Sequence, residues 1–461
     1  MLQRAIWDSL LEWKNRKHHP LLISGLRQVG KTYIVKEFGK RYYDQVVYLD
    51  LRANDTVRTA FDGNFDVDQM VMAISANVFN THFEPYHTLI ILDEIQDCPN
   101  ARSSLKYWDL DGRYDVIATG SFLGVKGFRG PYKRGIPVGY EESITMFPLT
   151  FREFLINVGI GTDVLEYVQS CIAMLTPIQQ AVHESMRSLY LQYLIVGGMP
   201  EAVNVFLRTH DLNQVRQLQK NILTSIRDDF GRYKDSEGKD QINQTLKLRA
   251  EACLDSLPAQ LSKDYKKFQY SLVQAKGHST DKADGLQYLV DCGLVIKSYN
   301  LREISTPLEA VKIATEFKVF MADTGLLISM FDQGTAALIL EGKLGAYKGA
   351  VAENMVAAAL ASSNHALYYL HAPNGSPELD FISTISTEPV IIECKSTNNR
   401  ATSMKYVLSH PEKYGNHIGI KIADANIGST GLYNTYPLYA IGFIPADNPS
   451  LTVPEIRIKL P

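Results

Sequence analysis

The chain has 461 residues, of which 45% are hydrophobic and 21% are charged, and its formal net charge is −3. This length exceeds one ordinary hydrophobic core and predicts about two to four domains. The balanced charge is not that of a protein coated for nucleic acid, although it leaves room for a local basic surface. The five cysteines are scattered without a Cys-x-x-Cys pair, which indicates neither a zinc site nor a disulfide framework and fits a reducing compartment.

The first 18 residues place Leu2, Ile6, Leu10 and Trp13 on one helical face between charged residues. This pattern predicts an amphipathic surface helix and not a signal peptide. No uncharged apolar run in the sequence is long enough to span a bilayer. We therefore expect a cytoplasmic protein without a membrane partner.

The segment Gly25–Thr32 reads Gly-Leu-Arg-Gln-Val-Gly-Lys-Thr and matches the phosphate-binding loop G-x-x-x-x-G-K-[ST] at every fixed position. An apolar run at residues 20–24 predicts a strand before it. Apolar residues at helical spacing predict a helix over residues 33–41 after it. A strand, a glycine loop and a helix in this order are the context in which such a loop binds nucleotide.

Each residue type in the loop has a physical reason. Gly25 and Gly30 allow backbone angles that turn successive N–H groups toward a phosphate. The helix start adds its positive end, and Lys31 supplies a mobile charge for the β- and γ-phosphates. The Thr32 hydroxyl is suited to hold Mg²⁺. The predicted ATP-binding residues of this loop are Gly25, Gln28, Val29, Gly30, Lys31 and Thr32.

Two further strands are predicted to bring side chains to the same nucleotide. The apolar run at residues 88–92 ends in Asp93 and Glu94 and is typical of a buried parallel strand, whose carboxyl end faces the ligand. Asp93 would complete the Mg²⁺ shell, and Glu94 would polarise the attacking water. The next strand, residues 114–119, ends at Thr119 and Ser121, which are placed to sense the γ-phosphate. Ser121 could also serve as a helix N-cap.

Strands at residues 45–50 and 144–147 alternate with helices around these segments and predict a doubly wound α/β domain over residues 1–160. An arginine usually meets the charge on the transferred phosphoryl group, in cis or from a neighbour. Arg129, Arg134 and Arg152 are candidates by position, and Arg27 fits a structural or interface role better. A second copy or a partner protein is the other source of such an arginine.

Four stretches together resemble a family of prokaryotic AAA-superfamily ATPases that carry a C-terminal domain of unknown function. They are residues 25–32, 92–96, 119–121 and 147–154. The resemblance covers essentially the whole chain and implies a P-loop ATPase with an acid-activated water. Family members usually place a Gly-Arg pair before the Pro-Leu-[ST]-Phe run. This chain has Arg-Gly-Ile-Pro-Val-Gly at residues 134–139 instead, which weakens the transfer of an arginine role to this loop.

The middle of the chain is predicted to be helical over residues 161–245, as a lid or connector that is broken at residues 197–202. Residues 221–233 read as a solvated helix face or as a nucleotide sensor. Residues 246–325 read as helix, helix and hairpin, the order of a winged helix. This unit could bind DNA or protein, and its basic bias comes from Lys263, Lys266, Lys267, Lys276, His278 and Lys282.

Residues 326–461 carry a second candidate centre. Glu353 lies in a predicted helix, Asp380 at the start of a strand, and Glu393 and Lys395 two apart on the next strand. Residues i and i+2 of a strand share a face, so these last two are expected to be neighbours. The order resembles the restriction-endonuclease-like superfamily, with an α-β-β-β-α-β core. That resemblance implies a divalent cation held by Glu353, Asp380 and Glu393, with Glu378 as a further candidate, and a water oriented by Lys395.

The sequence therefore supports three hypotheses. The first is an ATP- and Mg²⁺-dependent enzyme that couples ATP hydrolysis to a nuclease-like domain near DNA. The second is an ATPase switch whose C-terminal half binds DNA or protein without cleaving it. The third is an interaction protein that binds ATP without turnover, against which Glu94 argues.

Overall fold

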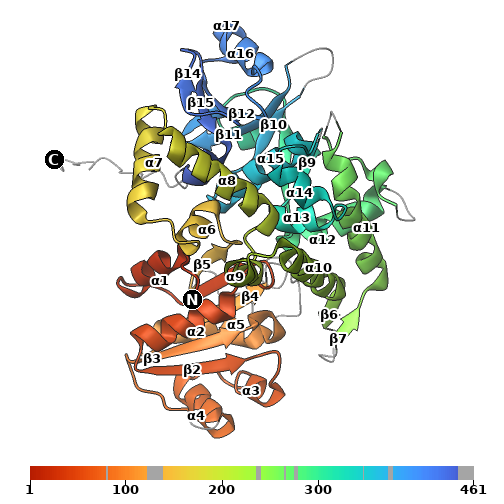
Figure 1. The fold of residues 1–461 in the computed structure, drawn as a ribbon. Coiled ribbons are helices and arrows are strands. Elements are labelled where there is room, and N and C mark those ends of the chain that lie inside the picture. The colour runs from red at the N-terminus through yellow and green to blue at the C-terminus, as the bar shows by residue number, and fades with distance from the viewer. Residues whose placement is uncertain are drawn as a thin grey trace, which may run out of the picture.

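The computed structural model describes residues 1–78, 81–121, 139–234, 240–263, 266–274, 279–345, 347–371 and 377–444. Figure 1 shows an α/β unit formed by the first part of the chain, an eight-stranded sheet unit formed by the last part, and helices between them. The two larger sheets of the described chain are thus joined through helical contacts.

The first unit is a five-stranded sheet in the order β2-β3-β4-β1-β5, with every pairing parallel. Its strands are β1 Leu21–Gly25, β2 Gln45–Asp50, β3 Thr88–Asp93, β4 Asp115–Ser121 and β5 Glu142–Met146. The elements that accompany them are α1 Ile6–Lys14, α2 Lys31–Tyr42, α3 Asp55–Thr59, α4 Val67–Asn77, η1 Ile95–Asp97 and α5 Pro99–Asp111. The parallel-sheet α/β fold that the alternating pattern predicts is confirmed.

The order of these strands positions the predicted ATP site. Strands β3, β4 and β1 are direct neighbours, and because they are parallel, their carboxyl ends meet at one edge. All six residues of β3 are buried, as a continuous apolar run in a sheet covered on both faces requires. The phosphate loop follows β1 at this same edge.

Helices connect the two sheets. They are α6 Phe151–Asn157, α7 Thr162–Met174, α8 Gln180–Val196, α9 Pro200–Thr209 and α10 Leu212–Asp228. A capping box of Thr150 and Glu153 begins α6. The helical prediction is wrong at its end, because Gly231 adopts a φ of 73° and the chain continues as a small hairpin of β6 Arg232–Lys234 and β7 Asp240–Ile242.

The predicted helix, helix and hairpin then follow in order. They are α11 Gln244–Leu261, η3 Tyr270–Leu272, α12 Ser279–Asp291, β8 Val295–Leu301, η4 Leu308–Val311 and β9 Lys312–Met321. The hairpin is not an isolated wing. Strand β8 also pairs in parallel with β10, so the hairpin extends the C-terminal sheet.

The C-terminal sheet is mixed and runs β14-β15-β13-β12-β11-β10-β8-β9. Its further strands are β10 Tyr368–Leu370, β11 Leu379–Ile385, β12 Glu388–Lys395, β13 Ile418–Ala423, β14 Gly428–Ser429 and β15 Asn434–Pro437. The accompanying helices are α13 Thr324–Ser329, α14 Thr335–Leu340, α15 Tyr347–Ser362, α16 Thr402–Leu408, α17 Pro411–Tyr414 and η5 Leu438–Phe443. From α15 to β13 the elements run α-β-β-β-α-α-β, which is the expected order with the short helix α17 added after α16. The sheet itself continues across the boundary predicted at residue 325.

The largest hydrophobic cluster is shared by all of these parts. It reaches from Ile6 in α1, through the middle helices, to Phe443 in η5. Helix α8 contributes Tyr190 and Tyr193, and Phe151 of α6 packs against both rings. In the part of the chain that the structure describes, no helix combines the length and the apolar character needed to cross a membrane.

Candidate active sites

The phosphate loop begins where β1 is tightly enclosed. A Cβ on Gly25 would lie 2.2 Å from the carbonyl oxygen of Met146 in β5, so a glycine is required there. Gly30 has a φ of 92°, which glycine adopts without strain, and α2 begins at the next residue. The loop therefore presents backbone N–H groups and a helix N-terminus at the carboxyl edge of the sheet.

Lys31 is buried within the loop. Its Nζ donates to the carbonyl oxygens of Gly25 and Leu26, each at 3.1 Å. Burial lowers the pKa of Lys31 to about 8, although the nearby Glu94 and Asp93 carboxylates oppose this shift. A phosphate at this position would stabilise the charged form and give the ammonium a stronger partner than two carbonyl groups.

Asp93 at the end of β3 is the centre of a hydroxyl network. The Oγ1 of Thr32 donates to its two carboxylate oxygens at 2.9 and 3.0 Å, and the hydroxyl of Tyr48 donates to Oδ2 at 2.7 Å. The Thr119 hydroxyl also donates to Asp93. Residues from β2, β3, β4 and the start of α2 thus meet at one carboxylate, where hard oxygen donors suit Mg²⁺.

Glu94 leaves the strand in a left-handed conformation, with a φ of 54°. Its carboxylate accepts a hydrogen bond from the side-chain amide of Gln96. The left-handed conformation of a non-glycine residue at a strand end costs free energy and is common where function fixes a side chain. The structure thus places both predicted acids at the edge where the phosphate loop lies.

The other residues predicted for the loop face different partners. The Gln28 amide donates to the Ser225 hydroxyl of α10 at 3.1 Å, and Val29 is buried with its carbonyl oxygen accepting from Arg4 at 3.1 Å. Ser121 ends β4 beside Gly25. Gln28 therefore contributes its side chain to the contact with the middle helices, and its part in ATP binding stays a prediction for the backbone.

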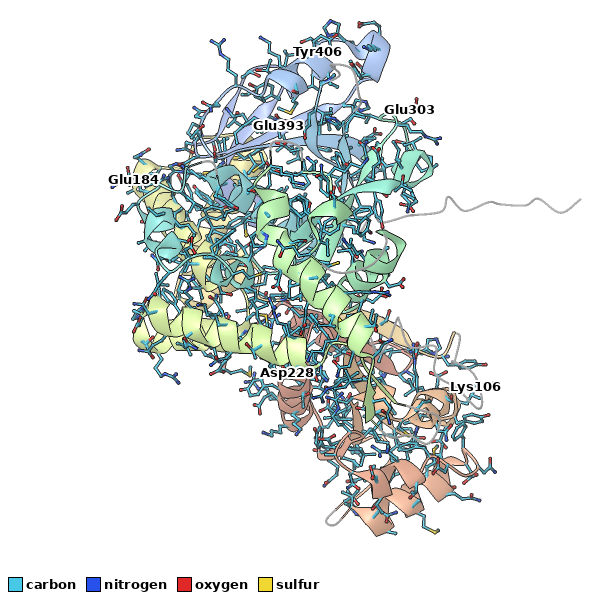
Figure 2. All side chains as sticks on the ribbon, turned by 90° about the vertical axis from the view of Figure 1, so that its right-hand side faces the viewer. Lys106, Glu184, Asp228, Glu303, Glu393 and Tyr406 are labelled. Atoms are coloured by element: carbon cyan, nitrogen blue, oxygen red, sulfur yellow. The ribbon has the colours of Figure 1, made fainter. Side chains whose placement is uncertain are left out.

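Arg27 forms an ion pair with Asp229, which follows α10. The interface role expected for Arg27 agrees with this geometry. Asp228, the neighbouring residue, marks in Figure 2 the end of α10 where it meets the first unit. Arg152 is exposed on α6 and lines a surface groove with Trp7 and Arg41. Arg129 and Arg134 lie outside the described residues.

The second candidate centre lies on the C-terminal sheet, where Figure 2 shows Glu393. The Nζ of Lys395 lies 2.6 Å from Oε1 of Glu393, as the alternation of β12 predicts, and 3.9 Å from Oδ2 of Asp380. The backbone N–H of Cys394 donates to Asp380 at 2.9 Å. The antiparallel pairing of β11 with β12 brings these side chains together.

Glu353 of α15 completes this cluster from the side of the helix and forms an ion pair with Lys266. Burial and the neighbouring Asp380 carboxylate raise the pKa of Glu393 to about 7, and the same two causes raise the pKa of Glu353. The second carboxylate oxygens of Glu353 and Glu393 are buried, and neither has a hydrogen-bond partner among the described residues. We call Glu353, Asp380, Glu393 and Lys395 the acidic centre.

Lysines, and not further acids, fill the space around this centre. Among the described residues, no three His, Cys, Asp or Glu side chains stand together as a ready metal site. Lys266 and Lys395 each pair with one of the carboxylates. Glu378, the further metal-ligand candidate, instead pairs with the fully buried Lys318 at 3.3 Å.

The basic residues of the winged-helix-like region make internal contacts. Lys267 pairs with Glu316 at 2.7 Å, and Lys263 donates to the Gln269 side chain at 2.7 Å. Lys282 donates to two backbone carbonyl oxygens, those of Tyr270 and Val273. The described lysines of this set therefore stabilise the fold of this region, while Lys276 and His278 lie outside the described residues.

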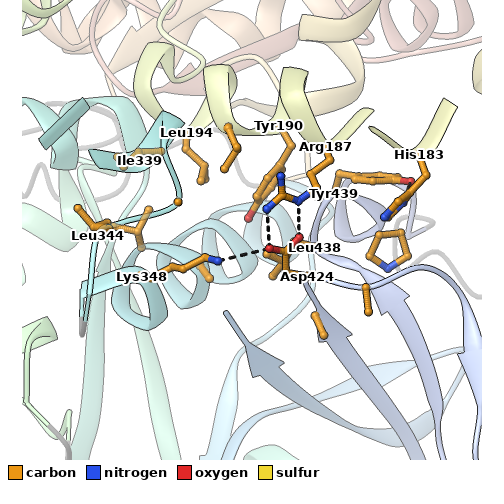
Figure 3. Close-up of a pocket in the computed structure, with 17 residues that line it drawn as sticks. His183, Arg187, Tyr190, Leu194, Ile339, Leu344, Lys348, Asp424, Leu438 and Tyr439 are labelled. Carbon is orange, nitrogen blue, oxygen red and sulfur yellow. Dashed lines mark hydrogen bonds and ion pairs between the residues drawn. The ribbon is translucent and has the colours of Figure 1, made fainter. Parts of the chain in front are cut away.

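A small cavity lies where α8 meets the C-terminal sheet (Figure 3). The Arg187 guanidinium of α8 donates two hydrogen bonds to the Asp424 carboxylate, at 2.6 and 2.8 Å. The Nζ of Lys348 lies 3.3 Å from the same carboxylate. The free interior volume is about 30 Å³. Small-molecule sites usually offer roughly 300 Å³ or more, so this cavity is a packing gap beside an ion-pair contact between units.

Three contributors to these sites were not predicted. Tyr48 carries a signal that could have been used: it is a polar residue on β2, two positions before the carboxyl end of that strand, and β2 lies beside β3, which ends at Asp93. Gln96 follows Glu94 by two residues and carries no distinguishing signal. Lys266 was counted only in the basic bias of a unit that could bind DNA or protein, because its partner Glu353 lies 87 residues away and no local pattern joins them.

Comparison with protein-family models divides the chain into three parts. Residues 17–155 match a family described as an AAA domain. This first unit is an AAA-type P-loop ATPase domain. Residues 187–337 and 348–439 match two domains of unknown function, DUF8612 and DUF4143. A search of curated proteins found no match.

Solved structures similar to the chain include other P-loop proteins. A Walker-type ATPase of Pyrococcus abyssi is 13% identical and gives a TM-score of 0.41, covering 72% of this chain and 96% of its own. The Aeropyrum pernix ORC1 protein in complex with DNA is 14% identical, with a TM-score of 0.28 and coverages of 73% and 91%. The Thermotoga maritima RuvB branch migration motor is 10% identical, with a TM-score of 0.30 and coverages of 62% and 85%.

Proposed function

We propose that the AAA domain binds ATP with Mg²⁺ and hydrolyses it. The observation that carries this proposal is the convergence of the Thr32, Tyr48 and Thr119 hydroxyls on the Asp93 carboxylate, directly beside the phosphate loop. These groups come from four separate segments. Their hydrogen bonds hold in register the oxygen ligands that a Mg²⁺–ATP complex requires.

The residues divide the chemistry between them. Loop N–H groups and the Lys31 ammonium bind the phosphates, Thr32 and Asp93 hold the ion, and Thr119 and Ser121 sense the γ-phosphate. Bound Mg²⁺ would neutralise charge on the phosphate oxygens. Glu94 orients the attacking water, and the Gln96 amide holds its carboxylate in place. An arginine, in cis or from a second copy or partner, meets the charge of the transferred group.

Replacing Glu94 with Gln tests this assignment. We expect ATP hydrolysis to fall about a hundredfold or more while Mg²⁺–ATP binding survives, because only the group that positions the water is lost. Lys31→Ala is expected to weaken binding itself. Glu37→Gln, on the exposed side of α2, is the control. Hydrolysis that persists in Glu94→Gln would overturn the assignment, and a protein without ATP binding would overturn the proposal.

We further propose that the C-terminal sheet unit is a metal-dependent nuclease that acts on DNA. The support is the pair of buried carboxylate oxygens, on Glu353 and Glu393, that have no partner within the described chain. An unpartnered buried carboxylate oxygen is costly, and a divalent cation bound between these residues would satisfy both. These two carboxylates therefore offer oxygen ligands to a metal, although among the described residues no three His, Cys, Asp or Glu side chains stand close enough together to hold one.

In this function Glu353, Asp380 and Glu393 hold the cation, which would stabilise charge on the phosphate being cleaved. Lys395 lies against Glu393. Burial alone would lower the pKa of Lys395, but Asp380 and Glu393 outweigh it and raise the pKa. Lys395 is therefore held as a charged ammonium, which can orient a water by donating a hydrogen bond to it.

The experiment is cleavage of single- and double-stranded DNA with Mg²⁺ or Mn²⁺, with and without ATP. We expect cleavage by the wild type and by Lys405→Ala, a change on the exposed face of α16, and none by Lys395→Ala. A difference with ATP would show that the AAA domain gates the centre. If the wild type hydrolyses ATP but cleaves no DNA, the nuclease proposal fails, and the alternative of an ATPase switch with a binding module replaces it.

A further inference from the structure

Lys266 reaches the acidic centre from another part of the chain. It lies on the segment between α11 and α12, which matches a different family model from α15, β11 and β12. Two residues on, the N–H of Phe268 donates to the carbonyl oxygen of Phe317 in β9 at 2.8 Å, and the two phenyl rings stack. The backbone beside Lys266 is therefore fixed along the edge of the sheet.

The ammonium of Lys266 neutralises one of the proposed metal ligands. It pairs with one oxygen of Glu353, and their side chains are 14% and 9% exposed. Two positive groups cannot share one buried carboxylate without strong repulsion. The Lys266–Glu353 pair and a divalent cation on Glu353 are therefore mutually exclusive or strongly opposed.

We propose that Lys266 is a built-in cation that closes the acidic centre, and that it must leave Glu353 before a divalent cation binds there. This inference rests on the proposed metal site and adds its regulation. The centre then has a closed state, shown by the structure, in which a lysine neutralises Glu353. In its open state the segment at residues 266–274 shifts far enough to withdraw the Lys266 side chain from Glu353.

Contacts connect this segment to the ATP site. Arg27 of the phosphate loop pairs with Asp229, whose carbonyl oxygen accepts from the Tyr288 hydroxyl of α12 at 3.1 Å. From the same helix, Lys282 donates to the carbonyl oxygens of Tyr270 and Val273 at 3.1 and 2.8 Å. The segment that carries Lys266 is therefore bonded to the helix that contacts the end of α10. A phosphate that drew Arg27 away from Asp229 would disturb the first of these contacts.

The test is direct metal binding, without nucleotide and without a cleavage assay. Mn²⁺ is titrated against the full chain and the free ion is followed by electron paramagnetic resonance. Every variant carries Asp93→Asn, so that the ATP site contributes little. The variants are Lys266→Ala, Lys266→Gln, Glu353→Gln and, as a matched control, Lys267→Ala, which removes the neighbouring lysine from its separate pair with Glu316.

We expect both Lys266 variants to bind Mn²⁺ about tenfold or more tightly than the parent, the scale of one charge-assisted pair. Lys267→Ala should match the parent, and Glu353→Gln should bind most weakly. Thermal unfolding confirms that each variant is folded, and Lys266→Gln keeps the side-chain volume. Equal affinity of the parent and both Lys266 variants, with loss in Glu353→Gln, would overturn the inference and leave the metal site standing. No binding by any form would overturn the metal site itself.

Discussion

At the scale of single residues, one carboxylate organises the ATP site. Asp93 accepts hydrogen bonds from Thr32, Tyr48 and Thr119. When Thr32 turns to a bound ion, Tyr48 and Thr119 remain as the donors that fix the orientation of the carboxylate, with Tyr48 on Oδ2. Burial and the bond to Asp93 raise the pKa of Tyr48, so its hydroxyl stays protonated at neutral pH. Tyr48 is thus a positioning residue that acts through Asp93.

We predict that Tyr48→Phe raises the Mg²⁺ concentration needed for half-maximal ATP hydrolysis about tenfold, since a hydrogen bond to a charged group is lost. Binding of ATP without Mg²⁺ should be unchanged. A Mg²⁺ titration of hydrolysis in wild type and variant measures this, with Tyr42→Phe at the exposed end of α2 as control. An identical Mg²⁺ dependence would contradict the positioning role.

The sequence predicts such residues when they lie close together in the chain. The phosphate loop is a contiguous pattern, and Glu393 and Lys395 are neighbours because strand side chains alternate. Tyr48 and Lys266 were missed because their partners are brought to them by tertiary contacts, 45 and 87 residues away. The partners of the lysines that give the winged-helix-like region its basic bias could not be predicted for the same reason, since Lys266 and Lys267 pair with distant carboxylates and Lys282 with backbone carbonyl oxygens. DNA or protein binding by this region stays a prediction.

At the scale of elements, the turn between α8 and α9 joins the AAA domain to the C-terminal sheet. The N–H of Gly198 donates to Asp323 at 2.6 Å, and its carbonyl oxygen accepts from the N–H of Leu149 at 2.7 Å. A Cβ on Gly198 would lie 2.1 Å from the Leu149 carbonyl oxygen. Pro200, which begins α9, lies against Gly30 of the phosphate loop. Position 198 must therefore be a glycine for the AAA domain, the middle helices and the C-terminal sheet unit to pack closely at this turn.

Asp323 gives this junction a pH dependence. Burial raises its pKa to about 6, against the backbone N–H groups that bond to it. Because the folded-state pKa exceeds the unfolded value, the contribution to stability is full below about pH 4 and is lost as pH rises through 6. We predict that Asp323→Asn removes this slope, so that the free energy of unfolding relative to wild type gains about 2 kcal/mol between pH 4 and pH 6.5.

Urea unfolding over this pH range measures the difference, and Asp332→Asn on the exposed loop after α13 is the control. Parallel pH profiles for wild type and Asp323→Asn would contradict the prediction. The variant also loses the hydrogen bonds that the N–H groups of Gly198 and Leu326 donate to Asp323, which lowers its stability by the same amount at every pH. The informative quantity is therefore the slope of the unfolding free energy against pH.

Elements with strong local signals were predicted from the sequence, and their assembly was not. Apolar runs indicated β1, β3 and β12, and the parallel sheet followed from the alternation of strands and helices. The pairing of β8 with β10 joins residues about 70 positions apart and depends on which edges remain open after folding. A hairpin that looked like a separate wing therefore became part of a larger sheet.

At the scale of the whole molecule, the phosphate loop contacts the middle helices directly through Arg27 and Gln28. We predict that a nonhydrolysable ATP analogue with Mg²⁺ speeds amide hydrogen exchange at residues 266–274, because a phosphate competes with Asp229 for Arg27. Asp229→Ala should show fast exchange already without the analogue. Hydrogen exchange followed by mass spectrometry measures this, with Asp255→Ala, the partner of Arg227, as control. Equal exchange with and without the analogue in wild type would show that these contacts do not respond to nucleotide.

The C-terminal sheet is built from two segments that match different families, which constrains how the gene can be inherited and how the protein can be cut into fragments. The match to one family ends at residue 337 and the next begins at 348, yet β8 of the first and β10 of the second are hydrogen-bonded neighbours. A gene that carried either segment alone would encode a sheet whose edge strand, β8 or β10, has lost its neighbour. The unpaired N–H and C=O groups of that edge could then pair with other chains. We therefore expect the two segments to be inherited together in one gene. A fragment of the protein that ends between them is expected to aggregate.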